Sequence, residues 1–139
     1  MREIDLNCDL GEGQDEDAIY PCITSANVAC GGHAGDAATM EAAVRGALRH
    51  GVSVGAHPSY PDREGFGRTV LPMTAEKIAE AVREQTAALA RIAGRLGTAL
   101  SHVKPHGALY GEAMKDASVA EAIAPMVKGA KALAARPAL

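Results

Sequence analysis

The sequence T-S-A-N-V-A-C-G-G-H-A-G-D, residues Thr24–Asp36, is the most informative stretch of the chain. Ser25–Cys30 is small and partly β-branched, which is typical of a buried strand. We expect Gly31–Gly32 to end this strand, because glycine permits the sharp turn between a strand and a helix. Asp36 has the side chain of a helix N-cap. His33 is thereby placed at the carboxyl end of a strand, where α/β folds bind ligands.

The length and composition indicate a globular protein. The chain has 139 residues, 47% hydrophobic and 3% aromatic, so residues 1–139 are expected to form a single domain with an aliphatic core. Lys and Arg number 14 against 17 acidic residues, for a net charge of −3, and no basic cluster is present. Binding to nucleic acid depends on clustered Lys and Arg, so no nucleic-acid partner is expected.

The sequence also bears on location. No apolar stretch approaches the roughly 20 residues that span a membrane, and the charged N-terminus lacks an apolar signal core, so no membrane partner is expected. Cys8, Cys22 and Cys30 are odd in number and lack C-x-x-C spacing, which favours a reducing cytoplasm over a disulfide framework. Cys30 could be a nucleophile near His33, but its place in a strand favours a buried thiol.

The first predicted strand is Ile4–Leu10, in which apolar and polar residues alternate. On a surface strand the polar residues would face water. In a barrel they would face the lumen while the apolar residues pack under helices. The polar positions are Asp5, Asn7 and Asp9, and Gly11 and Gly13 close the strand around Glu12.

Helices and strands are predicted to alternate along the rest of the chain. Proline should kink or restart the last helix, since it cannot donate the helical hydrogen bond. The expected elements are a helix from Asp36 to Gly51, a strand over Val52–Ala56, a helix over Ala75–Leu96 capped by Thr74, a strand over Leu100–Lys104, and a helix from Ser118 towards Ala135 that contains Pro125. Strands separated by such helices indicate parallel βαβ units.

A loop rich in glycine and proline is predicted over Ser59–Met73. Loops of this length in compact domains are usually functional or disordered. Arg63 and Arg68 could clamp a carboxylate or a phosphate there, or could be solvated loop charges. A P-loop signature is absent from the sequence.

Polar side chains occur at or just after the end of every predicted strand. Their predicted convergence at one mouth suits two chemistries: a divalent metal that activates water, or acid–base catalysis by Asp and His with Lys and Arg holding an anion. His102, Lys104 and His106 are expected on one face of the last strand by the period of two. The strand-end residues are Asn7, Asp9, His33, His57, Lys104 and His106.

Four motifs resemble the signatures of the LamB/YcsF family, whose members form the A subunit of bacterial 5-oxoprolinase. The motifs are D-L-N-C-D-L-G-E (Asp5–Glu12), S-A-N-V-A-C-G-G-H-A-G-D (Ser25–Asp36), G-A-H-P-S-Y-P-D-R-E-G-F-G-R (Gly55–Arg68) and V-K-P-H-G-A-L-Y (Val103–Tyr110). The resemblance implies a parallel (β/α) barrel of the glycoside hydrolase/deacetylase type. It further implies opening of 5-oxo-L-proline to L-glutamate, coupled to hydrolysis of ATP to ADP and phosphate, with partner subunits B and C.

The resemblance assigns the pocket residues of the family to the matching positions of this sequence. As our hypothesis, the catalytic residues are Asp9, His57, Lys104 and His106, and the residues that bind substrate or phosphate are Asn7, Glu12, His33 and Arg68. ATP is the co-substrate. An alternative is a metal-dependent hydrolase or deacetylase on the same barrel, with Mg²⁺ or Zn²⁺ held by Asp9, His33 and His57. A third alternative is a non-catalytic remnant that binds a partner protein.

About half of a barrel is expected in this chain. Four strands cannot close a barrel, which takes close to eight. The chain is therefore expected to be the N-terminal part of a longer protein, or to complete its sheet as a homo-oligomer with a second copy of itself.

Overall fold

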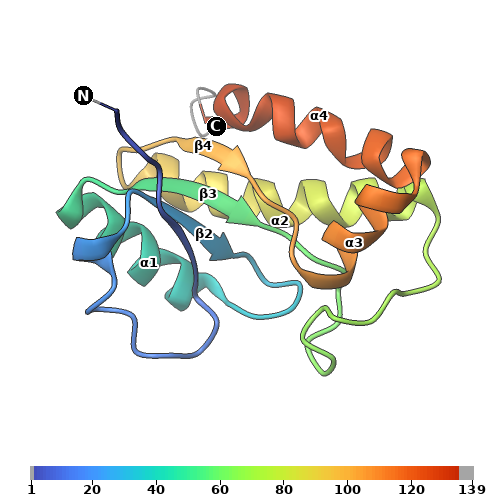
Figure 1. Cartoon of the computed structure of the whole chain (residues 1–139), viewed down its shortest axis with the longest axis horizontal. Helices are drawn as coiled ribbons and strands as arrows, with labels where there is room; N and C mark the ends of the chain where they lie inside the picture. Colours follow the sequence, from blue (N-terminus) through green and yellow to red (C-terminus); the bar gives the residue numbers. More distant parts are fainter. Residues whose placement is uncertain (1, 135–139) are drawn as a thin grey trace.

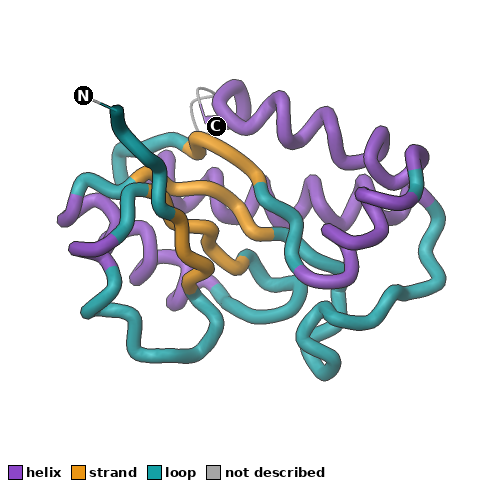
Figure 2. The backbone as a smooth tube through the Cα atoms, viewed as in Figure 1, coloured by secondary structure: helices purple, strands orange, loops and turns teal. Residues whose placement is uncertain are grey.

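The computed structural model describes residues 2–134, with side chains described for residues 2–130. Four parallel strands alternate with helices, as the sequence predicts, and they lie side by side in sequence order. The strands are β1 (Asn7–Leu10), β2 (Ser25–Ala29), β3 (Ser53–His57) and β4 (Leu100–Val103). The helices are α1 (Ala37–His50), α2 (Ala75–Arg95), α3 (Gly107–Lys115) and α4 (Ala117–Ala134), and a 3-10 turn, η1 (Tyr20–Cys22), precedes β2. Figure 1 shows these elements, and Figure 2 shows the strands at the centre with the helices around them.

The two faces of the sheet differ in chemistry. Val28, Val54 and Leu100 belong to the main apolar core, which also includes residues of α1 and α2. Asn27 and Gly55 alternate with Val28 and Val54 along their strands and therefore lie on the opposite face. The apolar face thus packs under the helices and the polar face lines the inner side of the sheet, as the barrel interpretation predicts.

The first strand is shorter than predicted. The sequence predicts Ile4–Leu10, whereas β1 begins at Asn7. Ile4 and Leu6 are 77% and 51% exposed, and only Leu10 at the far end is fully buried. The expectation that the whole apolar row lies under helices is therefore wrong, because no described element covers the start of this row.

The predicted helix starts are confirmed. The Asp36 carboxylate accepts a hydrogen bond from the Thr39 backbone N–H at 2.8 Å, and the Thr39 hydroxyl accepts one from the Asp36 backbone N–H, which forms a capping box. The Thr74 hydroxyl accepts a hydrogen bond from the Lys77 backbone N–H at 3.2 Å at the start of α2. Both helices then bury an apolar stripe against the sheet.

The C-terminal helices differ from the expectation. Helix α3 is absent from the predicted elements, since its nine residues carry a weak apolar pattern in which only Leu109 is buried. Helix α4 runs continuously past Pro125 within its described part, so the expected restart does not occur. Buried residues on both sides of the proline, Ile123 and Met126, hold it against its neighbours, whereas Val127 is 43% exposed. The predicted end of this helix at Ala135 lies outside the described residues.

The sheet stays open. β1 and β4 are its outer strands, and within residues 2–134 neither pairs with a further strand. This agrees with the expected half barrel. None of the helices in this part of the chain has both the length and the apolarity needed to cross a bilayer.

Candidate functional site

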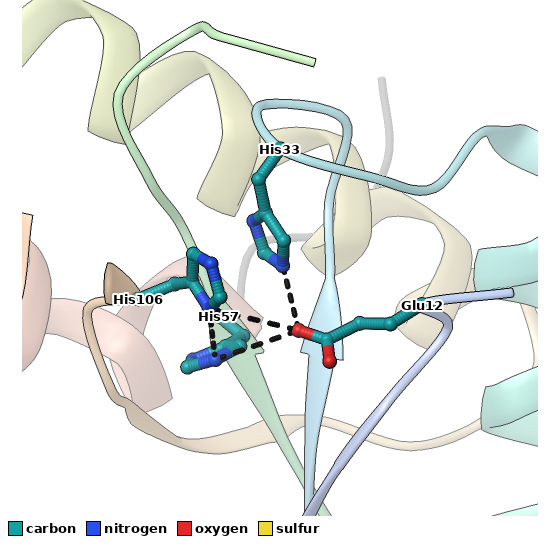
Figure 3. Close-up of side chains that lie close together, drawn as sticks. All are labelled: Glu12, His33, His57 and His106. Atoms are coloured by element: carbon teal, nitrogen blue, oxygen red, sulfur yellow. Dashed lines mark hydrogen bonds and ion pairs between the residues drawn. The ribbon is translucent and has the colours of Figure 1, made fainter. Parts of the chain in front are cut away.

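Four side chains from four separate strand ends meet at the carboxyl edge of the sheet. Glu12 follows β1, His33 follows β2, His57 is the last residue of β3, and His106 is the N-cap of α3 after β4. One ligand atom from each lies within 4.8 Å of the others, and the three histidines are buried. Figure 3 shows the side chains pointing toward one another. We call this group the histidine cluster.

Two tight turns position Glu12 and His33, the first two members of the histidine cluster. The Gly11 N–H donates to both oxygens of the Glu16 carboxylate, at 2.7 and 2.9 Å, which ties down the turn that carries Glu12. Gly31 has a φ of 104°, a conformation that glycine adopts without strain, and it turns the chain so that His33 faces the sheet edge. The role of Glu16 cannot be predicted from the sequence, because nothing local indicates what its carboxylate contacts.

The protonation of His57 and His106 follows from their backbone partners. His57 Nδ1 lies 2.6 Å from the Lys104 carbonyl oxygen, and His106 Nε2 lies 2.8 Å from the Phe66 carbonyl oxygen. A carbonyl only accepts, so both of these nitrogens carry protons. The other two nitrogens, His57 Nε2 and His106 Nδ1, are therefore the lone-pair positions of the neutral rings, and they face each other at 3.1 Å. Glu12 Oε1 lies 3.8 and 3.6 Å from them.

His33 has a different role in the cluster. Burial, together with the nearby His106 and His57 rings, lowers the pKa of His33 to about 3. The neutral ring donates Nε2–H to Glu12 Oε1 at 2.7 Å and stacks on His106 at 3.6 Å between ring centroids. Its Nδ1 is buried and has no partner among the described atoms. His33 thus orients the Glu12 carboxylate.

Asp9 and Lys104 form a second group beside the cluster. Lys104 Nζ lies 3.1 Å from Asp9 Oδ1, and Asp9 Oδ2 lies 3.5 Å from His57 Nε2. A hydrogen bond from His57 when that ring is protonated at Nε2, aided by Lys104 and Asn27, holds the pKa of the Asp9 carboxyl well below its usual range. The ionised carboxylate is half-exposed, so it can contact both the cluster and a bound molecule.

The remaining predicted site residues lie farther out. Arg68 is exposed, with its guanidinium 5.1 Å over the Phe66 ring. Asn7 is exposed on β1 and accepts a hydrogen bond from Asn27 at 2.8 Å. Arg63 donates to the carbonyl oxygens of Gly35 and Gly31, at 2.7 and 3.3 Å. Its guanidinium therefore stabilises the turn that follows β2.

Phe66 is a site residue that the sequence does not single out. Its ring lies edge-on to His33 and His106, at 5.0 and 5.1 Å, and its carbonyl fixes the tautomer of His106. Phe66 has a φ of 53°, the only positive value of a non-glycine residue in the described chain. Such strain gathers at functional sites. The G-F-G pattern of Gly65–Gly67 is the one available signal.

The candidate nucleophile Cys30 plays no part in this site. Burial raises the pKa of its thiol to about 12, and 4% of the residue is exposed. The expectation of a buried thiol is therefore confirmed, although Cys30 lies one residue after the end of β2.

Comparison with protein families matches residues 4–135 to the LamB/YcsF family. The chain belongs to the LamB/YcsF family. It is also similar to the lactam utilization protein from Thermus thermophilus, whose crystal structure it matches with 44% sequence identity and a TM-score of 0.86. The match covers 88% of this chain and 52% of that one, so this LamB/YcsF chain spans about half the length of the solved structure.

The donor set in this LamB/YcsF chain fits a cation. His57 Nε2 and His106 Nδ1 turn lone pairs toward one point, and carboxylate oxygens of Glu12 and Asp9 lie nearby. Two imidazoles and a carboxylate are common ligands of Zn²⁺. Of the three metal ligands expected from the sequence, His33 and His57 belong to the cluster, while Asp9 lies beside it and Glu12 and His106 complete it.

Proposed function

We propose that this chain belongs to the A subunit of an ATP-dependent 5-oxoprolinase and contributes catalytic residues at the carboxyl edge of its sheet. This enzyme opens 5-oxo-L-proline to L-glutamate while ATP is hydrolysed to ADP and phosphate. One observation carries the proposal: Asp9, Lys104 and His57 lie together at the carboxyl edge of a LamB/YcsF half barrel. The related protein from Thermus thermophilus is named for lactam utilization, and 5-oxoproline is a lactam. The proposal includes subunits B and C as partners and a cytoplasmic location.

The chemistry explains why ATP is needed. A lactam carbonyl is a weak electrophile, and phosphorylation of its oxygen makes the ring carbon open to attack by water. Water then adds, the ring C–N bond breaks with a proton going to the nitrogen, and a second water releases phosphate. In this scheme Asp9, with His57 or His106, accepts the proton of the attacking water. Lys104 stabilises the negative charge on oxygen, and Arg68 binds the substrate carboxylate.

The test is turnover in the assembled enzyme with subunits B and C. Asp9→Ala and Lys104→Ala are each expected to reduce 5-oxoproline-dependent ATP hydrolysis by about 10²–10⁴-fold. Lys115→Ala is the matched control, because Lys115 is an exposed lysine on α3 whose ion-pair partner is Glu112. Near-normal turnover in either site variant would contradict the assignment. Binding to subunits B and C without any turnover in the unaltered protein would instead support the partner-binding alternative.

A metal-dependent hydrolase or deacetylase is the second candidate. It is favoured by the lone pairs of His57 Nε2 and His106 Nδ1, which face each other at 3.1 Å with Glu12 beside them. These three residues would hold a divalent ion, which when bound polarises a carbonyl or lowers the pKa of water. His33 would keep Glu12 oriented, as hydrogen-bonding neighbours of metal ligands do. Amide hydrolysis that needs no ATP and stops on addition of a chelator would support this candidate over the first.

A further inference from the structure

A single row of residues crosses all four strands on the inner face of the sheet. The register pairs Asp9 with Asn27, Asn27 with Gly55, and Gly55 with His102. Asn27 is 1% exposed, so its amide must be satisfied by protein groups. Neither Asn27 nor His102 belongs to the histidine cluster or to the expected catalytic set.

Gly55 leaves the space that lets His102 reach across β3. A Cβ at this position would collide with the His102 ring at Nε2. Because glycine has no side chain, the imidazole passes over β3, and His102 Nε2 lies 2.7 Å from Asn27 Oδ1 on β2. On its other side, His102 Nδ1 lies 2.6 Å from the Ser101 hydroxyl.

The charge on Asp9 sets the direction of every hydrogen bond in this row. Asp9 is ionised beside Lys104, so its Oδ1 only accepts, and the Asn27 amide must turn Nδ2 toward it at 3.1 Å. The second Nδ2 proton goes to Asn7 Oδ1 at 2.8 Å, which leaves Asn27 Oδ1 to accept from His102 Nε2–H. His102 Nδ1 then accepts from the Ser101 hydroxyl. Burial also lowers the pKa of His102, which favours the neutral ring that this arrangement needs.

We infer that Asn27 and His102 are positioning residues, which hold the Asp9 carboxylate so that Oδ1 faces Asn27 and Lys104 and Oδ2 faces His57. The inference rests on the proposed function, because it concerns how Asp9 is presented to the reaction. In this row Ser101 donates to His102, His102 donates to Asn27, and Asn27 donates to Asp9. These hydrogen bonds restrict the rotation of the half-exposed Asp9 carboxylate. A catalytic group held in this way loses less freedom in the transition state.

The first test measures turnover in the assembled enzyme. Asn27→Leu keeps the branched shape of the side chain and removes the hydrogen bonds, and it is expected to lower kcat about tenfold or more with KM within about twofold. His102→Leu is expected to act in the same way, while His102→Gln retains an N–H near the position of Nε2 and restores kcat to within about threefold. Equal losses in the Leu and Gln variants, or a change confined to KM, would overturn the positioning role.

Gly55 allows a matched pair of glycine-to-alanine variants. Gly55→Ala is expected to displace the His102 ring and lower kcat, whereas Gly94→Ala, on the outer side of α2 with nothing within 4 Å of the added Cβ, leaves kcat unchanged. In a His102→Ala background the Gly55→Ala change is expected to have no additional effect on the melting temperature, because the clashing ring is gone. A full additional loss there would contradict the proposed contact.

The second test needs no turnover. Nitrogen NMR of the histidine rings in the chain alone is expected to show that His102 is protonated at Nε2 and unprotonated at Nδ1. Asn27→Leu is expected to abolish this preference for a single tautomer. A wild-type His102 protonated at Nδ1 would overturn the inference, since Asn27 and Asp9 would then be connected differently. If the assembled enzyme shows no 5-oxoproline-dependent ATP hydrolysis, the proposed function fails, while the NMR result still decides whether the row exists.

Discussion

His57 Nε2 lies 3.1 Å from His106 Nδ1, and each ring presents to the other the nitrogen that its backbone partner leaves without a proton. Two neutral imidazoles in this geometry repel through their lone pairs. A shared proton or a bound metal ion removes the repulsion. The Glu12 carboxylate lies 3.8 and 3.6 Å from the same two atoms. Its negative charge makes the binding of a cation at this point more favourable.

We therefore expect the histidine cluster to bind Zn²⁺. A metal that binds only the folded state stabilises it, by about 2.7 kcal/mol at a hundredfold excess over Kd, so Zn²⁺ should raise the melting temperature. His57→Ala and His106→Ala should lose most of this rise. His50→Ala is the control, because His50 lies on α1, stacks on Tyr20 and contacts the Gly46 carbonyl oxygen. An equal rise in the His57 variant and the unaltered protein would show that the zinc binds elsewhere.

Arg68 provides a test of substrate binding. Its guanidinium is exposed and rests over the Phe66 ring, which itself contacts His33 and His106. If Arg68 binds the carboxylate of 5-oxoproline, Arg68→Ala should raise KM about tenfold or more while kcat changes little, since ground and transition states lose the same contact. Steady-state kinetics of the assembled enzyme give both constants. Arg91→Ala, on the exposed side of α2, is the control, and an unchanged KM for Arg68→Ala would exclude this role.

The three cysteines should react at different rates with a thiol reagent. Cys22 is exposed and should be modified first, and Cys8 is partly buried with a pKa raised by burial and by Asp9. Cys30 is buried, and its pKa of about 12 leaves almost no thiolate near neutral pH. Mass spectrometry of the labelled peptides should find Cys30 modified only after unfolding. Rapid labelling of Cys30 in the folded protein would show that β2 opens or that its environment differs.

The start of α1 should be sensitive to acid. Hydrogen bonds from Thr39 lower the pKa of the Asp36 carboxyl in the folded protein. A group whose folded pKa is depressed stabilises the fold above its unfolded pKa, about 3.9 for Asp, and loses that contribution as the pH falls. Asp36→Ala should therefore lower the melting temperature at about pH 7, and its difference from the unaltered protein should shrink toward about pH 3. A gap that stays constant with pH would rule out the charge of Asp36 as the cause.

The sequence by itself determined the alternation of parallel strands with helices and the identity of most residues at the sheet edge. These features depend on local signals. Asp36 and Thr74 cap helices through side chains a few residues from the groups they bind. His33 and His57 follow short apolar strands whose ends are marked by Gly31 and Pro58. The LamB/YcsF motifs are also contiguous, so the family could be inferred without a structure.

Only the tertiary structure decided which polar side chains meet. The sequence placed His102, Lys104 and His106 on one face, yet Lys104 contacts Asp9, His106 joins the histidine cluster and His102 turns away to Asn27. This division depends on the lateral register of four strands and on the gap at Gly55. The same holds for the pairing of His57 with His106, whose protons are assigned by carbonyl groups of Lys104 and Phe66. Contacts between residues far apart in the chain are fixed by packing and register, and no periodicity within one strand encodes them.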